Sequence, residues 1–145
     1  MKNAEKTIGD LIAKCKTSFI ASIDDDGFPN MKAMLMPRER NGIKTFLFST
    51  NTSSERVAQF RKNPKASIYF YRKGLTAWQG AMLRGTMEIL EDEESKKRIW
   101  QKGDTVYYPQ GVSDPDYCVL KFTAFSGRYY RAGLGGFEIE SFDVK

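Results

Sequence analysis

Residues 45–60 read TFLFSTNTSSERVAQF, and this stretch decides the fold because it joins a strand directly to a helix. Its first four residues are β-branched, aromatic or aliphatic, as is typical of a strand. Residues 49–56 are rich in helix-capping side chains, and Val57 and Phe60 have the spacing of a buried helix face. Asn63-Pro64 is expected to end this short helix.

The residues before this stretch predict a helix followed by a three-stranded meander. Apolar residues at positions 8, 11, 12 and 15 have helical spacing, and Thr7 with Asp10 resembles a capping box. Residues 19–23 alternate and lead to Asp26-Gly27, a hairpin signal, so a second strand is expected over residues 30–36. A further turn at Asn41-Gly42 would lead into the strand that begins at Thr45 in the stretch quoted above.

The residues after it predict more strands and one more helix. Strands are expected over residues 66–71 and 76–90, where Gly80 and Gly85 indicate bends or a close backbone approach. A helix over residues 92–102 and a long loop follow, and two or three strands end the chain, around residues 119–123, 128–131 and 137–142. We expect one mainly β domain over residues 1–145, an antiparallel barrel with helices at its edges.

Composition narrows the possible functions. The chain has 41% hydrophobic residues and a formal charge of +5, but its basic residues are scattered, so no nucleic-acid partner is expected. Histidine is absent and the two cysteines match no metal or redox spacing, which argues against a metal site or a Ser-His-Asp triad. We recognise no signal peptide and no membrane-spanning run, so we expect a cytoplasmic protein without a membrane partner.

The start of the helix after residue 54 is the best candidate for chemistry. Free backbone N–H groups and the helix dipole attract anions, and here Ser53, Ser54 and Arg56 add two hydroxyls and a guanidinium. One interpretation is therefore a phosphate site. The other is ordinary N-capping beside a surface arginine, and the residues alone leave both open.

Aromatic residues in the second half of the chain have two interpretations as well. They could pack a core or a dimer interface, or they could line a pocket for a flat ring. The Gly-rich residues 133–136 are interpreted as a mobile turn rather than a phosphate loop, because no helix pattern follows them. The aromatic residues concerned are Trp78, Trp100, Tyr107, Tyr108, Tyr129 and Tyr130.

The ordered set of motifs resembles the pyridoxamine 5'-phosphate oxidase-like family. Residues 48–56 match the family's strand end, Thr-Asn turn and Ser-x-Lys/Arg pair. Trp100, residues 108–111, Asp114-Pro115-Asp116 and Tyr129-Tyr130 are similar in order and spacing to its general stress protein branch. The resemblance covers residues 19–130 and implies an FMN-binding split β-barrel that forms a homodimer.

The resemblance also implies a set of cofactor-binding residues. Ser54 and Arg56, with Ser53 at the same helix start, would hold the FMN phosphate. The flavin would lie along the strand of Lys32, Ala33, Met34 and Leu35, with Ser49 and Thr50 near its ring. Gln79 is the nearest match to a flavin-facing glutamine, and Trp100 and Tyr130 would come from the partner subunit.

Departures from the family separate FMN binding from vitamin B6 oxidation. Full oxidases grip their substrate with Arg and His residues in a final segment, whereas this chain has no His and residues 138–145 carry no such motif. The expected function is an FMN-dependent oxidoreductase that uses a small-molecule electron donor or acceptor, with catalytic residues unassigned. The alternatives are a flavin-binding or storage module, or a split barrel that uses F420 or pyridoxal phosphate.

Overall fold

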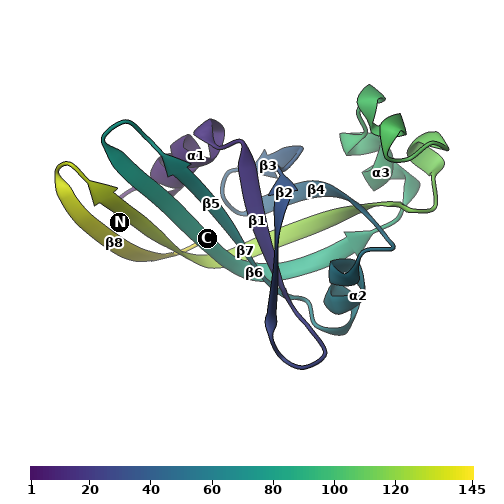
Figure 1. Ribbon diagram of the computed structural model, residues 1–145, viewed down its shortest axis with the longest axis horizontal. Helices are drawn as coiled ribbons and strands as arrows, with labels where there is room; N and C mark the ends of the chain where they lie inside the picture. The colour runs from purple at the N-terminus through teal and green to yellow at the C-terminus, as the bar shows by residue number, and fades with distance from the viewer.

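The computed structural model describes residues 1–145, which form three α-helices, two short 3-10 helices and eight strands (Figure 1). The elements in chain order are α1 (Ala4–Lys14), β1 (Thr17–Ile23), β2 (Pro29–Leu35), β3 (Glu39–Asn41), β4 (Thr45–Asn51), α2 (Glu55–Lys62), β5 (Lys65–Lys73), β6 (Ala77–Leu90), α3 (Glu93–Ile99), η1 (Lys102–Val106), η2 (Gly111–Ser113), β7 (Tyr117–Gly133) and β8 (Gly136–Asp143). None of the helices combines the length and the apolar character needed to cross a membrane.

All strand pairs are antiparallel, and they form one eight-stranded sheet with the order β2-β1-β5-β6-β7-β4-β3, in which β8 also pairs with β7. The predicted mainly β, antiparallel split barrel is therefore confirmed. The predicted opening meander is wrong, because β1 lies between β2 and β5, and β4 pairs with β7. The turn signals predicted the two hairpins correctly, but they contain no information on which distant strand each hairpin joins.

The long strands β6 and β7 form the central ribbon of the sheet. The residues predicted as two separate strands, 119–123 and 128–131, belong to the single strand β7. The pairing of β6 with β7 shifts register between Arg84 and Gly85. A Cβ on Gly85 would lie 2.0 Å from the carbonyl oxygen of Thr123 on β7. The predicted close approach at Gly85 is thus confirmed. The β5–β6 and β7–β8 hairpins project together on the side away from α3 (Figure 1).

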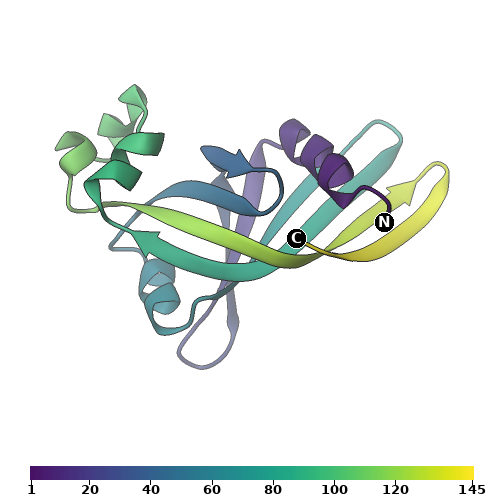
Figure 2. The same ribbon diagram turned by 180° about the vertical axis from the view of Figure 1, so that it is seen from behind.

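The main core lies between the sheet and α1. Ile8, Leu11 and Ile12 of α1 are buried against aromatic and aliphatic residues of the strands. Figure 2 shows α1 lying across β5 and β6. The helix is capped by Asn3, whose side chain accepts a hydrogen bond from the Lys6 amide, so the predicted start at Thr7 is wrong.

A second, smaller core lies on the other face of β4. It contains Leu47, Ile99, Tyr108, Tyr117 and Val119, and it attaches α3 and the 3-10 segments to the barrel. The predicted third helix is shorter than expected. It ends at Ile99, Trp100 and Gln101 are extended, and η1 begins at Lys102. β4 thus contributes residues to both cores before the chain leads into α2 (Figure 1).

Candidate functional site

A cavity of about 280 Å³ lies between the edge strand β2, the strand β4 and the 3-10 segment η1. Seven of the twelve cofactor-binding residues predicted from the sequence line it, although they come from three separate segments. The seven are Lys32, Ala33, Met34, Leu35, Ser49, Thr50 and Arg56, and the other lining residues are Met36, Arg38, Asn51, Asp104, Tyr107 and Tyr108.

The β2 wall of the cavity is an open strand edge. β2 pairs only with β1, and most of its residues are exposed. Lys32 pairs with the buried Ile20, and Met34 pairs with the buried Ser18. Paired residues of antiparallel strands point to the same face, so Lys32 and Met34 lie on the face of Ile20 and Ser18, where Met34 is half-buried and Lys32 is exposed. The main chain of β2 therefore offers free hydrogen-bonding groups beside a lysine.

The opposite wall is the end of β4 and the first turn of α2. Thr50 is 3% exposed, and its hydroxyl accepts a hydrogen bond of 2.9 Å from the Arg56 guanidinium. Arg56 is only 8% exposed and forms no ion pair with a carboxylate. Its Nε atom is buried and has no hydrogen-bond partner. Burial removes the charge from water and lowers the pKa of this guanidinium, and the opposing effects of Tyr108 and Cys118 are smaller.

An unpaired buried guanidinium is costly, since a buried charge normally has a partner. The loss of hydration is tolerated at sites where a ligand supplies the missing partner. Arg56 lines the cavity, so an anion there could accept from the terminal nitrogen Nη1, which forms no hydrogen bond and is not among the buried unpartnered atoms. This arrangement favours the phosphate interpretation of the helix start over the surface-arginine interpretation.

The two serines before α2 behave differently from each other. Ser54 is the N-cap, and its hydroxyl accepts from the Val57 amide. The Ser53 amide instead donates to the Asp116 carboxylate at 2.9 Å, and its hydroxyl accepts from Asn51. Neither serine is among the residues that line the cavity. The structure therefore confirms a helix cap at Ser54, while the unpartnered guanidinium at this turn belongs to Arg56.

The third wall is the segment after α3. Its Tyr107 and Tyr108 were predicted either to pack a core or to line a pocket for a flat ring, and both line the cavity. Asp104 is 3% exposed, and both of its carboxylate oxygens accept hydrogen bonds from Arg38, at 2.8 and 3.0 Å. Burial opposes ionisation of Asp104, but hydrogen bonds from Arg38 and the Gln101 amide outweigh it and hold the pKa of this carboxyl below its ordinary value. No local pattern marks such a pair, because its residues are 66 positions apart.

Three further predicted site residues lie away from this cavity. Gln79 on β6 donates to the Tyr129 hydroxyl at 2.8 Å. Trp100 packs edge-on against Tyr117 in the smaller core, with the ring centroids 5.1 Å apart. Tyr130 packs edge-on against Phe137 of β8. Within one chain, none of the three lines the cavity with Arg56.

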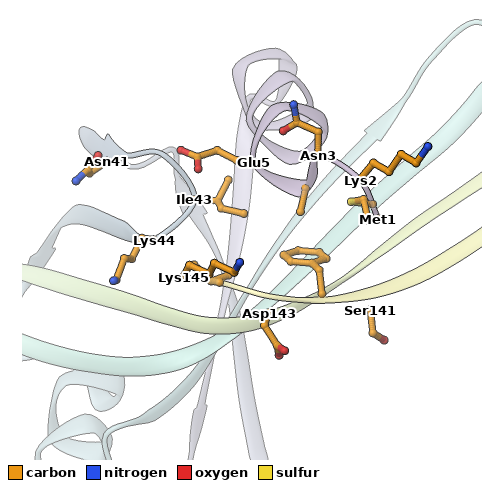
Figure 3. A pocket seen from close by; sticks show the side chains of 13 residues that line it. Met1, Lys2, Asn3, Glu5, Asn41, Ile43, Lys44, Ser141, Asp143 and Lys145 are labelled. Carbon is orange, nitrogen blue, oxygen red and sulfur yellow. The ribbon is translucent and has the colours of Figure 1, made fainter.

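A larger cavity, of about 720 Å³, lies between the two chain ends and the β3–β4 turn (Figure 3). None of the predicted cofactor-binding residues lines it. Lys2, Lys44 and Lys145 border it together with Glu5 and Asp143, and both kinds of charge are visible around its opening. Its size alone does not make it the better candidate, because no buried side chain there lacks a partner in the way that Arg56 does.

Similarity to known proteins identifies the family of the chain. A sequence model of the family described as "Pyridoxamine 5'-phosphate oxidase" matches residues 4–131. The chain belongs to the pyridoxamine 5'-phosphate oxidase family. A pyridoxine/pyridoxamine 5'-phosphate oxidase of Legionella pneumophila is 29% identical over 76 residues, which are 52% of this chain and 34% of the relative. The chain thus matches about a third of the length of this curated member of the family.

Solved structures of the family match over nearly the whole chain. One is a Clostridium acetobutylicum protein related to general stress protein 26 of B. subtilis, of the pyridoxinephosphate oxidase family. It is 37% identical, has a TM-score of 0.84, and the match covers 99% of this chain and 96% of that one. General stress protein 26 from Bacillus anthracis has a TM-score of 0.76 at 17% identity, with 98% and 99% of the chains covered, and shows the shared fold alone.

Proposed function

We propose that this chain is a flavoprotein that binds FMN in the cavity between β2, β4 and η1. The single observation that carries the proposal is the buried Arg56 guanidinium, whose Nε has no partner and which lines the cavity at the start of α2. FMN ends in a phosphate, which is the kind of anion that such a guanidinium and a helix start bind. Family membership supports the same assignment.

The residues fit the phosphate end of FMN. Arg56 would donate to the phosphate, and Thr50 orients the guanidinium through its 2.9 Å hydrogen bond. Ser54 would add a hydroxyl beside the free amides of the first turn of α2. Ser53, which the sequence resemblance also implied, would act indirectly, because it fixes the turn through Asp116.

The residues also fit the ring end. The exposed main chain of β2 at Ala33, Met34 and Leu35 would face the flavin, with Lys32 and Ser49 beside it. Bound FMN supplies the hydride or electron transfer, while the protein supplies binding and electrostatics. A lysine near the ring would favour negative charge that develops there. We therefore propose an FMN-dependent oxidoreductase that acts on a small-molecule donor or acceptor.

We propose a homodimer as the functional form. The cavity of one chain, about 280 Å³, is slightly smaller than the roughly 300–1,000 Å³ of typical ligand pockets, so a second subunit would complete it. The outer face of the sheet carries exposed apolar side chains, among them Met31 and Leu35 of β2 and Phe19 of β1. In the dimer, Trp100 and Tyr130 would reach the partner's flavin. Sedimentation at micromolar concentration checks this proposal, and a monomer that still holds FMN would contradict it.

We further propose that pyridoxamine 5'-phosphate is a poor substrate. The chain has no histidine, and residues 138–145, most of which belong to β8, contain neither arginine nor histidine. Both thiols are free, which suits a reducing cytoplasm. Efficient formation of pyridoxal phosphate by the purified protein would contradict the substrate part of the proposal.

The absorbance and mass of the ligand that copurifies with the protein test the proposed cofactor. We expect flavin absorbance bands and the mass of FMN after denaturation. F420, pyridoxal phosphate or no ligand, even after incubation with FMN, would contradict the assignment. If FMN is found, the rate at which NAD(P)H bleaches its colour distinguishes an oxidoreductase from a storage module, because a storage protein would bleach only slowly.

A further inference from the structure

An aromatic side chain at the rim of the cavity has no role in the site as described so far. Tyr107 lines the cavity, yet it is 68% exposed. The neighbouring Tyr108 is 7% exposed and packs on Tyr117, with the ring centroids 5.0 Å apart, so it serves the smaller core. The only aromatic contact of Tyr107 is the tilted ring of Tyr108, at 6.4 Å. The Tyr107 ring therefore has an open surface beside the ligand space.

The main chain around Tyr107 is fixed by one buried residue, Asp104. The Asp104 carbonyl accepts hydrogen bonds from the amides of both Tyr107 and Tyr108, each at 2.9 Å. Its carboxylate accepts from the Gln101 amide and from both terminal nitrogens of Arg38. A single aspartate thus holds the turn that presents the Tyr107 ring.

Arg38 connects this turn to the rest of the site. It lies three residues after the end of β2, and its amide donates to the Leu47 carbonyl of β4 at 2.8 Å. Its guanidinium also donates to the Ile99 carbonyl at the end of α3. The Arg38–Asp104 pair therefore connects all three walls of the cavity, and any shift of Asp104 would move Tyr107 relative to β2.

We infer that Tyr107 contacts the planar ring of the bound ligand, and that the Arg38–Asp104 pair is the positioning device that holds it there. This inference rests on the proposed function, because it places a flat aromatic ligand in the cavity. An aromatic ring stacked on a flat ligand stabilises it through an offset or edge-on contact. Tyr107 would then be a ligand-contacting residue, whereas Asp104 would act only through the segment it fixes.

The first test is the affinity of Tyr107→Leu for FMN and for riboflavin, which share the ring but differ in the phosphate. We expect the dissociation constants of both ligands to rise by the same factor, roughly 2- to 12-fold, since stacking is lost. Tyr107→Phe should bind as the wild type does. Val106→Ala is the matched control, because Val106 is 80% exposed in the same segment but does not line the cavity.

The second test is a double-mutant cycle with Asp104→Asn. If Asp104 acts through Tyr107, Asp104→Asn should weaken riboflavin in the wild-type background and have almost no further effect in Tyr107→Leu. A purely structural role would lower the melting temperature equally but give additive effects on affinity. Arg38→Lys, which keeps the charge but loses the forked geometry, repeats the cycle if Asp104→Asn does not fold.

The outcomes separate this inference from the proposed function. If the wild type binds neither FMN nor riboflavin, the proposed function fails. If the wild type binds FMN but Tyr107→Leu binds both ligands equally well, only the inference about Tyr107 is overturned. A loss confined to FMN would also overturn it, because Tyr107 would then contact the phosphate end. A change in sedimentation without a change in affinity would assign Tyr107 to the dimer interface instead.

Discussion

Replacement of Arg56 by methionine should make the ligand-free protein more stable. Arg56 is 8% exposed, its Nε has no partner, and one hydrogen bond joins its guanidinium to Thr50. The unsatisfied Nε costs about 1–3 kcal/mol, but removal of the arginine leaves the buried Thr50 hydroxyl without a partner, which costs a similar amount. The remaining gain comes from removing a buried charge that has no counter-ion. The net change in the free energy of unfolding is therefore a gain of about 0–2 kcal/mol.

Thermal unfolding of the ligand-free protein measures this gain. For a chain of this size, a gain of about 1 kcal/mol corresponds to a rise in melting temperature of roughly 2–4 °C. Methionine is unbranched and adaptable, so it should fill most of the space of the arginine stem. The comparison must use protein without ligand, because a bound anion would stabilise only the wild type.

Arg61→Met is the matched control on the same helix. Arg61 is half exposed and pairs with Glu91 at 3.2 Å, so its replacement should change the free energy of unfolding by less than about 1 kcal/mol. A marked fall in the melting temperature of ligand-free Arg56→Met would refute the reasoning. It would show that the arginine stabilises the fold itself, as the capping interpretation requires.

Three further predictions concern the fold and its titration. Gly85→Ala should lower the free energy of unfolding in urea by about 3 kcal/mol or more, because its Cβ would lie 2.0 Å from the Thr123 carbonyl oxygen, while Gly103→Ala, with open space around the Cβ, should be close to neutral. The pKa of Asp104 is lowered in the folded protein, so its stabilising contribution is complete above the unfolded pKa of about 3.9 and is lost as the pH falls through the folded pKa. The difference in melting temperature between the wild type and Asp104→Asn should thus be largest above about pH 4 and shrink in acid, and a constant difference would contradict this. Burial raises the pKa of the Cys118 thiol to about 11, so a thiol-specific reagent at pH 8 should reach Cys118 only after unfolding, and rapid reaction of two thiols in the native protein would contradict the structure.

The sequence predicted the parts of the fold that depend on local chemistry. The Asp26-Gly27 turn joins β1 and β2 as expected, and α2 follows its capping residues and ends before Pro64. The order of the strands in the sheet was harder to predict from the sequence. Whether β1 pairs with β5, or β4 with β7, depends on contacts between residues more than 40 positions apart, which no turn signal encodes.

The candidate site was predicted in the same uneven way. Ser54 and Arg56, which were predicted to bind the phosphate, are close in sequence, and both lie at the start of α2 in the structure. The unpaired state of Arg56 was not predictable, because it depends on what the fold places around the guanidinium. The ion pair of Arg38 and Asp104 was not predicted for the same reason, because an arginine and an aspartate 66 residues apart carry no local signal.

The central claim is that Arg56 holds the phosphate of FMN, and a paired titration tests it most directly. FMN and riboflavin are titrated into the wild type and into Arg56→Met, and the four dissociation constants are compared. A lost charge-assisted hydrogen bond of about 1.5–3 kcal/mol predicts that FMN binds Arg56→Met about 10- to 100-fold more weakly. Riboflavin, which has no phosphate, should bind both proteins equally and more weakly than FMN binds the wild type. Equal affinity of FMN for the two proteins would contradict the claim.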